Sequence, residues 1–148
     1  MGLNTKEVGA SRVLIMDDDP SVRLLMWYAL RNAGFQVAVA DHPREAEERM
    51  RTESFDALVT DHHMPYETGL SFIRRMRTGE STHLETHKDI PVVMISSYNQ
   101  PDHLKDVAGL GVGALIQKPF RLPQFADTVR TVVNNGTLGP FIHVPSFA

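Results

Sequence analysis

Polar side chains able to do chemistry stand directly after the apolar stretches of this 148-residue chain. They are Asp17 and Asp18 after the first stretch, Asp61 after the third, Ser96 after the fourth and Lys118 after the fifth. Three carboxylates held close together raise one another's pKa, so such a cluster implies a cation that offsets their charge. The acidic and hydroxyl donors are all oxygens, which favours a hard ion such as Mg²⁺, because Mg²⁺ also bridges to phosphate oxygens. Lys118 adds a positive group suited to a phosphoryl oxygen.

The elements that must position these residues are predicted from the hydrophobic pattern. The apolar stretches predict strands at Val13 to Met16, Phe35 to Ala40, Phe55 to Thr60, Ile90 to Ile95 and, more weakly, Gly113 to Gln117. Segments of helical period lie between and after them, at Pro20 to Asn32, Pro43 to Arg51, Leu70 to Arg77, Pro101 to Ala108 and Leu122 to Val133. Near-continuous apolarity is typical of strands covered on both faces. The alternation predicts a doubly wound α/β domain with a five-stranded parallel sheet and five helices.

In sheets of this kind, ligands bind at the carboxyl ends of the strands. The five polar residues are therefore expected to meet at one edge of the sheet. In the first predicted helix, the apolar residues that recur at threes and fours are Val22, Leu24, Leu25, Tyr28 and Ala29, which predicts an apolar face there.

Length and composition exclude several classes of protein. A chain of 148 residues fits one domain, and the formal charge of −3 gives no electrostatic drive toward nucleic acid or an anionic membrane. No apolar run approaches the roughly 20 residues of a membrane span, and the N-terminus lacks the apolar core of a signal peptide. We therefore expect a cytoplasmic protein. The absence of cysteine fits this expectation and excludes disulfides, thiol catalysis and thiolate metal sites.

Two segments fit the alternating pattern poorly. Residues 78–89 are polar and longer than the usual connection between a helix and a strand, which predicts a surface insertion. We expect the domain to comprise residues 12–133, after an N-terminal extension of residues 1–11. Residues 134–148 are either a docked C-terminal tail or the start of a linker. This segment contains no charged residue, yet it holds Phe141, Ile142, Val144 and Phe147.

These motifs together resemble the receiver domain of two-component response regulators, the chemotaxis-type family with a flavodoxin-like fold, over roughly residues 12 to 133. The resemblance is carried by Val-Leu-Ile-Met-Asp17-Asp18-Asp19-Pro20, Asp61-His-His-Met64-Pro65 with Gly69, Val-Met-Ile-Ser96-Ser97 and Lys118-Pro119-Phe120. Each motif alone is weak, but their order and their common place after strands make the set specific.

The resemblance implies that Asp61 accepts a phosphoryl group from a histidine kinase or a histidine phosphotransfer protein, in a Mg²⁺-dependent reaction. It implies that Mg²⁺ is held by Asp17, Asp18, Asp61 and the backbone carbonyl of His63. Lys118 and Ser96 would bind the phosphoryl oxygens, and Ser96 would carry the signal. In the family the peptide bond before the proline that matches Pro119 is cis.

The implied protein is a signalling module that catalyses only its own phosphorylation and dephosphorylation. Its switched surface would act on an unknown output protein or domain, and a phosphorylation-dependent homodimer is compatible with it. In the family this surface is built from the fourth helix, fifth strand and fifth helix, here from Gln100 to Ala108, through Leu115, to Arg121 and beyond. Leu115 stands where the family often has Tyr or Phe, so the aromatic switch of the family is absent.

Two alternatives remain open from the sequence. In the first, Asp17 and Asp19 are the nucleophile and general acid of a haloacid-dehalogenase-like phosphatase, although Asp127 is the only carboxylate side chain after Lys118. In the second, the chain is a pseudo-receiver that binds partners without phosphorylation, against which the complete acidic set and the lysine speak. The histidines of the pairs His62, His63 and His83, His87 are interpreted as solvated side chains rather than ligands of a transition metal.

Overall fold

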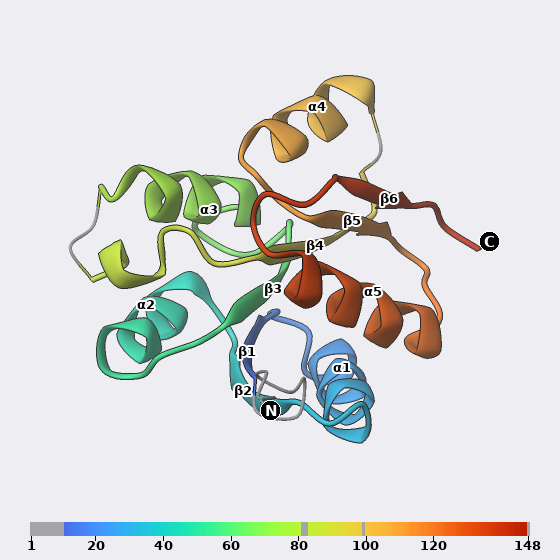
Figure 1. The fold of residues 1–148 in the computed structure, drawn as a ribbon, viewed down its shortest axis with the longest axis horizontal. Helices are drawn as coiled ribbons and strands as arrows, with labels where there is room; N and C mark the ends of the chain where they lie inside the picture. The colour runs from blue at the N-terminus through green and yellow to red at the C-terminus, as the bar shows by residue number, and fades with distance from the viewer. Residues whose placement is uncertain (1–10, 81–82, 99, 148) are drawn as a thin grey trace, which may run out of the picture.

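The computed structural model describes residues 11–80, 83–98 and 100–147, which form a parallel sheet with helices on both faces (Figure 1). The strands are β1 (Arg12–Met16), β2 (Gln36–Ala40), β3 (Ala57–Asp61), β4 (Val92–Ser96), β5 (Ala114–Gln117) and β6 (Ile142–Val144). The helices are α1 (Pro20–Asn32), α2 (Pro43–Thr52), α3 (Gly69–Thr78), α4 (Pro101–Gly109) and α5 (Leu122–Asn135), with a short 3-10 helix, η3 (Glu85–His87). The predicted doubly wound α/β fold is confirmed, with one strand more than expected.

The strand order is β2-β1-β3-β4-β5-β6, so the direction of winding reverses between β1 and β3. Successive residues of a strand point to opposite faces of the sheet, and each face has its own apolar cluster. Ile15 of β1 belongs to the cluster that includes Phe125 of α5, whereas its neighbour Leu14 belongs to the cluster that includes Phe72 of α3. Burial of both faces explains why the strands read as continuous apolar runs.

The sixth strand comes from the C-terminal segment. After α5 the chain turns back and β6 pairs in parallel with β5, with Ala114 opposite Ile142 and Ile116 opposite Val144. Val144 is buried against the α5 side of the sheet. We call residues 140–147 the C-terminal strap, because they run along the outer side of β5 (Figure 1).

The segment expected as a surface insertion is anchored in the core at two points. Leu84 is fully buried, and His87 is buried with its Nε2 accepting a hydrogen bond of 3.1 Å from the backbone N–H of Phe55. The interpretation of His87 as a solvated histidine is therefore wrong, because its imidazole satisfies a buried backbone donor. His83, four residues earlier, is exposed as expected.

Helix α1 buries fewer of its apolar residues than their spacing predicts. Met26 and Leu30 are fully buried, but Leu24, Leu25 and Tyr28 are each about half exposed. The stripe that packs on the sheet is therefore centred on Met26 and Leu30, and the predicted apolar face is wrong at those three positions. Within the described part of the chain, no helix has the length and apolarity needed to cross a membrane.

Candidate functional site

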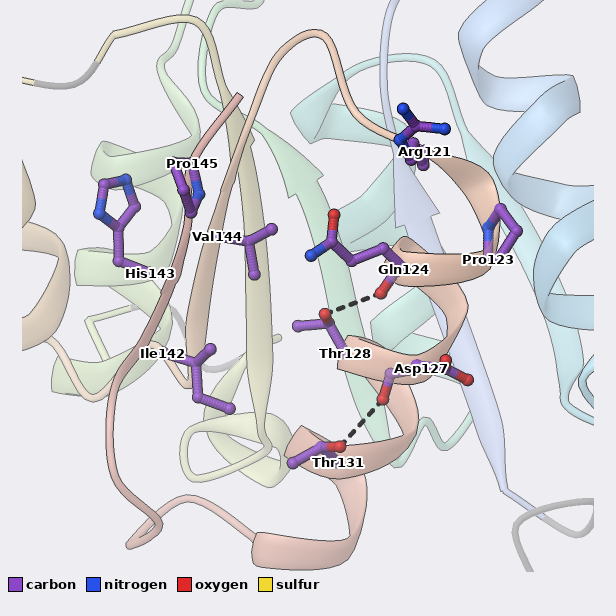
Figure 2. A pocket seen from close by; sticks show the side chains of 10 residues that line it. All are labelled: Arg121, Pro123, Gln124, Asp127, Thr128, Thr131, Ile142, His143, Val144 and Pro145. Carbon is purple, nitrogen blue, oxygen red and sulfur yellow. Dashed lines mark hydrogen bonds between the residues drawn. The ribbon is translucent and has the colours of Figure 1, made fainter. Parts of the chain in front are cut away.

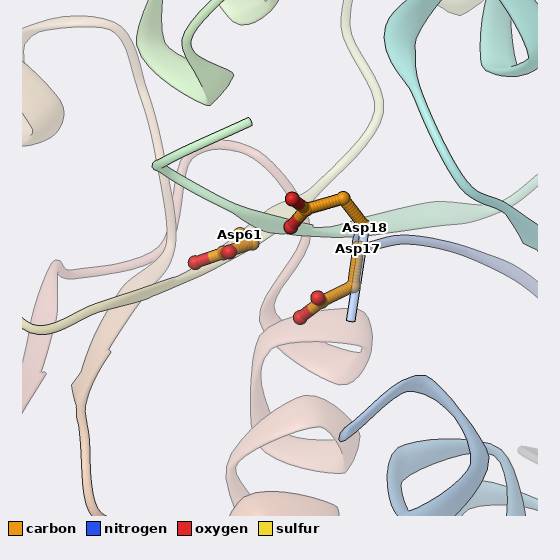
Figure 3. Close-up of side chains that lie close together, drawn as sticks. All are labelled: Asp17, Asp18 and Asp61. Carbon is orange, nitrogen blue, oxygen red and sulfur yellow. The ribbon is translucent and has the colours of Figure 1, made fainter. Parts of the chain in front are cut away.

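The three aspartates of the sequence motifs meet at the carboxyl ends of β1 and β3. These strands are neighbours in the sheet, and Asp17, Asp18 and Asp61 each have a carboxylate oxygen within 4.8 Å of the others (Figure 3). Asp17 and Asp61 are buried, whereas Asp18 is exposed. Of all residues that the structure describes, only these form a group of three or more acidic or histidine side chains with such close ligand atoms.

Asp17 provides an oxygen that a cation would satisfy. Its Oδ1 accepts a hydrogen bond of 2.9 Å from the backbone N–H of Asp19, but its Oδ2 is buried without a hydrogen-bond partner. The pKa of Asp17 is raised to about 6, chiefly by burial and also by the charge of Asp61, against the opposing effects of the Asp19 N–H and Lys118. A buried carboxylate oxygen without a donor is costly, and a hard cation would remove that cost. The donor set therefore fits Mg²⁺.

Lys118 brings a positive charge to the same place from the end of β5. Its Nζ lies 3.1 Å from Oδ1 of Asp61, and its backbone N–H donates a 2.9 Å hydrogen bond to the carbonyl of Ser96. The peptide bond between Lys118 and Pro119 is cis, as the resemblance implies. Asp61 thus lies between the acidic pair on one side and an ammonium group on the other.

Ser96 ends β4 and is fully buried, but its hydroxyl is engaged within its own loop. The Oγ accepts a hydrogen bond of 2.9 Å from the backbone N–H of Tyr98 and donates one of 3.3 Å to the carbonyl of the same residue. The structure therefore brings the three aspartates and Lys118 together, while the Ser96 hydroxyl is paired with Tyr98. Contact with a phosphoryl oxygen would require this hydroxyl to change partners.

The loop after Asp61 is fixed by a close approach of the backbone. Gly69 donates a 2.8 Å hydrogen bond to the carbonyl of His62, and a Cβ atom at Gly69 would clash with the carbonyl oxygen of Asp61. Thr68 accepts a hydrogen bond from the N–H of Ser71 and caps α3. The glycine of the motif is thus required by the space beside Asp61.

His62 is a residue whose role sequence reasoning missed. It is 8% exposed, and its ring packs against that of His103 on α4 with centroids 4.5 Å apart, so its interpretation as a solvated histidine is wrong. Burial lowers the pKa of His62 to about 4, which keeps the imidazole neutral at pH 7. His63 is exposed as expected. The contact between His62 and His103 joins distant parts of the chain, and the sequence alone does not specify it.

Asp19 has a structural task that bears on the phosphatase alternative. Its Oδ1 accepts hydrogen bonds from the backbone N–H groups of Ser21 and Val22, of 2.9 and 3.3 Å, and so caps α1. Its side-chain oxygen thereby satisfies two backbone donors in the first turn of the helix that have no partner within the helix. This capping role explains the presence of Asp19 without the catalytic role that the phosphatase alternative gives it.

Comparison with known proteins identifies relatives of this arrangement. A sequence model of the response regulator receiver domain matches residues 13–130. The chemotaxis protein CheY of Pseudomonas aeruginosa is 34% identical over 122 residues, which cover 82% of this chain and 94% of that protein. The virulence transcriptional regulatory protein PhoP of Salmonella typhimurium is 26% identical over 138 residues, 92% of this chain but 58% of that protein. The chain matches only 16% of the sensory/regulatory protein RpfC of Xanthomonas campestris.

Solved structures share the fold. The chemotaxis response regulator CheY4 of Vibrio cholerae superposes with a TM-score of 0.71 at 26% identity, over 82% of this chain and 98% of that one. The receiver domain of the Francisella response regulator 1452 superposes with a TM-score of 0.72 at 22% identity, over 84% and 97%. Since the family model spans most of the chain, and the acidic cluster stands at the strand ends, this chain belongs to the response regulator receiver domain family.

Proposed function

We propose that Asp61 is the residue on which this receiver is phosphorylated, by a histidine kinase or a histidine phosphotransfer protein. Receivers of this family take their signal through phosphorylation of an aspartate. One observation carries the assignment to Asp61: its buried carboxylate has Lys118 Nζ at 3.1 Å and lies within 4.8 Å of the oxygens of both other aspartates. No other carboxylate of the described chain combines these neighbours.

Lys118 holds Oδ1 of Asp61, so we assign the attack to Oδ2. The new bond joins this oxygen to phosphorus, the bond from phosphorus to the donor's imidazole nitrogen breaks, and that nitrogen keeps the electron pair and takes up a proton from water. The product is an acyl phosphate. Lys118 neutralises charge on the transferring group, which is most of what phosphoryl transfer requires of a protein.

The acidic cluster supports a Mg²⁺ site formed by the carboxylates of Asp17, Asp18 and Asp61, with the backbone carbonyl of His63 as a further ligand. A Mg²⁺ ion bound there would supply a second positive charge toward the phosphoryl oxygens. The unpartnered Oδ2 of Asp17 favours this assignment over a cluster of carboxylates that only face solvent.

We infer that the protein acts as a signalling module in the cytoplasm and catalyses only its own phosphorylation and dephosphorylation. Residues 12–133 would form the receiver, and its switched surface would bind an output protein or domain. The short distance between Lys118 and Asp61 favours this proposal over a pseudo-receiver, because a chain that works without phosphorylation has no need of that pair.

The test is incubation with acetyl phosphate or phosphoramidate and Mg²⁺, followed by intact mass and peptide mapping. We expect one Mg²⁺-dependent phosphoryl group on Asp61, none on Asp61→Asn, and normal labelling of Asp127→Asn, a matched change of an exposed carboxylate on α5. Full labelling of Asp61→Asn together with loss of labelling in Asp17→Asn would support the phosphatase alternative instead.

A further inference from the structure

The C-terminal strap ends beside the loop that carries Lys118. The pairing of Ile116 with Val144 aligns β6 so that the residues after it run past the end of β5. The backbone N–H of Phe147 donates a 3.4 Å hydrogen bond to the carbonyl of Pro119, and the guanidinium of Arg121 lies 4.6 Å from the centre of the Phe147 ring. The two contacts are thus with the first and the third residue after Lys118.

The strap is attached to the two faces of the sheet unequally. Val144 is buried with the α5 cluster, and Phe141 packs against the opposite cluster. An open groove of about 740 Å³ remains between the strap and α5, lined among others by Thr128, Thr131 and Ile142 (Figure 2). Because β6 is the edge strand, loss of its pairing with β5 would leave the pairing of the other five strands intact.

The strap also lies outside the residues that the receiver model matches. The receiver model matches residues 13–130, and β6 begins at Ile142. The contacts of Phe147 are therefore a property of this chain that the matched region does not account for.

We propose that the end of the strap positions Lys118, so that docking of the strap and occupancy of Asp61 by a phosphoryl group stabilise each other. This inference rests on the proposed function of Asp61. We assign a positive coupling because the docked strap coexists with a Lys118 that already lies 3.1 Å from Asp61, while Phe147 contacts Pro119 and Arg121. Coupling between two sites is reciprocal, so each event must favour the other by the same factor.

The test uses beryllofluoride, a mimic of the acyl phosphate, titrated with Mg²⁺ into the full chain. We expect Phe147→Ala to weaken beryllofluoride binding about two- to fivefold, the fold-change equivalent of one exposed cation–π contact. Phe147→Tyr keeps the ring and should restore the parent affinity. His143→Ala, an exposed change on β6 itself, should leave it unchanged.

Two readouts separate positioning from a general loss of structure. The affinity for Mg²⁺ alone should not fall in Phe147→Ala, because Phe147 contacts Pro119 and Arg121, and neither belongs to the acidic cluster. In the parent, beryllofluoride should slow hydrogen exchange of the Ile142 amide, which donates to the carbonyl of Gly113 at 2.9 Å. A double-mutant cycle with Arg121→Ala isolates the ring contact from the charge of the arginine.

Parent-like beryllofluoride affinity in Phe147→Ala would overturn the proposal. An exchange rate of the Ile142 amide that does not change when beryllofluoride is added would overturn it as well. Equal losses of Mg²⁺ and beryllofluoride affinity would also overturn it, since they indicate a structural effect. If the parent itself binds no beryllofluoride and takes no phosphoryl group, the proposed function fails and this inference fails with it.

Discussion

The ammonium group of Lys118 lies 3.1 Å from the carboxylate of Asp61, although Asp61 ends β3, Lys118 follows β5, and β4 lies between these strands in the sheet. The pair forms because parallel strands present their carboxyl ends at one edge. Lys118 is therefore in place before any phosphoryl group arrives, and little reorganisation is needed when it does.

Replacing this ammonium group should slow phosphorylation strongly. We expect Lys118→Met to reduce the rate with acetyl phosphate about 10²- to 10³-fold, the usual effect of removing one group that stabilises developing charge. The rate is measured by intact mass against time. Lys105→Met, at an exposed position on α4, is the control and should react at the parent rate. Equal rates for the two variants would exclude the role proposed for Lys118.

Mg²⁺ should stabilise the folded protein, since it binds the native cluster and relieves repulsion among its carboxylates. At a concentration 100 times its Kd, the gain is about 2.7 kcal/mol. The Tm should rise by about 2–4 °C for each kcal/mol in a chain of this size. Thermal unfolding with Mg²⁺ and with EDTA measures this, and Asp18→Ala should lose the response. An unchanged Tm at millimolar Mg²⁺ would argue against a metal site here.

Without metal, the ionisation of Asp17 should lower the free energy of unfolding as the pH rises toward neutrality. Burial raises its pKa from 3.8 to about 6, so the folded state binds this proton more tightly than the unfolded state. The associated stability is complete below pH 3.8 and is lost as the pH rises through about 6, by about 3 kcal/mol in total.

The comparison that isolates this effect is denaturant unfolding of the parent and Asp17→Asn in EDTA, from pH 4 to pH 7. As the pH rises across this range, the free energy of unfolding of Asp17→Asn should increase relative to that of the parent. Parallel curves for the two proteins would contradict the raised pKa.

Leu115 should matter for stability and not for phosphorylation. Its side chain is fully buried on the side of β5 that faces the cluster containing Val107 of α4. We expect Leu115→Ala to lower the free energy of unfolding by about 2–5 kcal/mol, while Asp61 is still phosphorylated. Chemical denaturation and mass spectrometry measure the two effects. A loss of labelling in a folded Leu115→Ala protein would mean that this position acts on the site as well.

Ser96→Ala should have little effect on stability and a large effect on signalling, the opposite of Leu115→Ala. Because the hydroxyl bonds only within its own loop, its loss should cost about 1 kcal/mol. It should also uncouple Asp61 from the α4 surface, if the hydroxyl transfers from Tyr98 to a phosphoryl oxygen. Two-dimensional NMR with and without beryllofluoride tests this. Parent-like shifts across Gln100 to Ala108 in Ser96→Ala would show that the hydroxyl is not the relay.

The fold and the acidic cluster could be predicted because both follow from local pattern and chain order. Continuous apolar runs identify strands buried on both faces, and parallel connection then places Asp17, Asp61 and Lys118 at one edge. Strand β6 could not be predicted in this way, since it has only three residues and stands between Pro140 and Pro145.

The burial of particular histidines also escaped prediction. His62 is covered by His103 of α4, and His87 is held by the backbone of Phe55, so both depend on contacts between distant parts of the chain. Leu24 and Leu25 were expected on the apolar face of the helix but are about half exposed. Helical spacing does not reveal which of several apolar stripes faces the sheet.

Strand β6 has a further consequence for how copies of the protein behave in solution. Without it, the outer backbone groups of β5 would be open to pairing with another chain, and β5 is an apolar stretch suited to intermolecular aggregation. With it, the outermost strand is three residues long and is followed by Pro145, which cannot donate a hydrogen bond. The strap thus makes this side of the sheet a poor template for uncontrolled self-association.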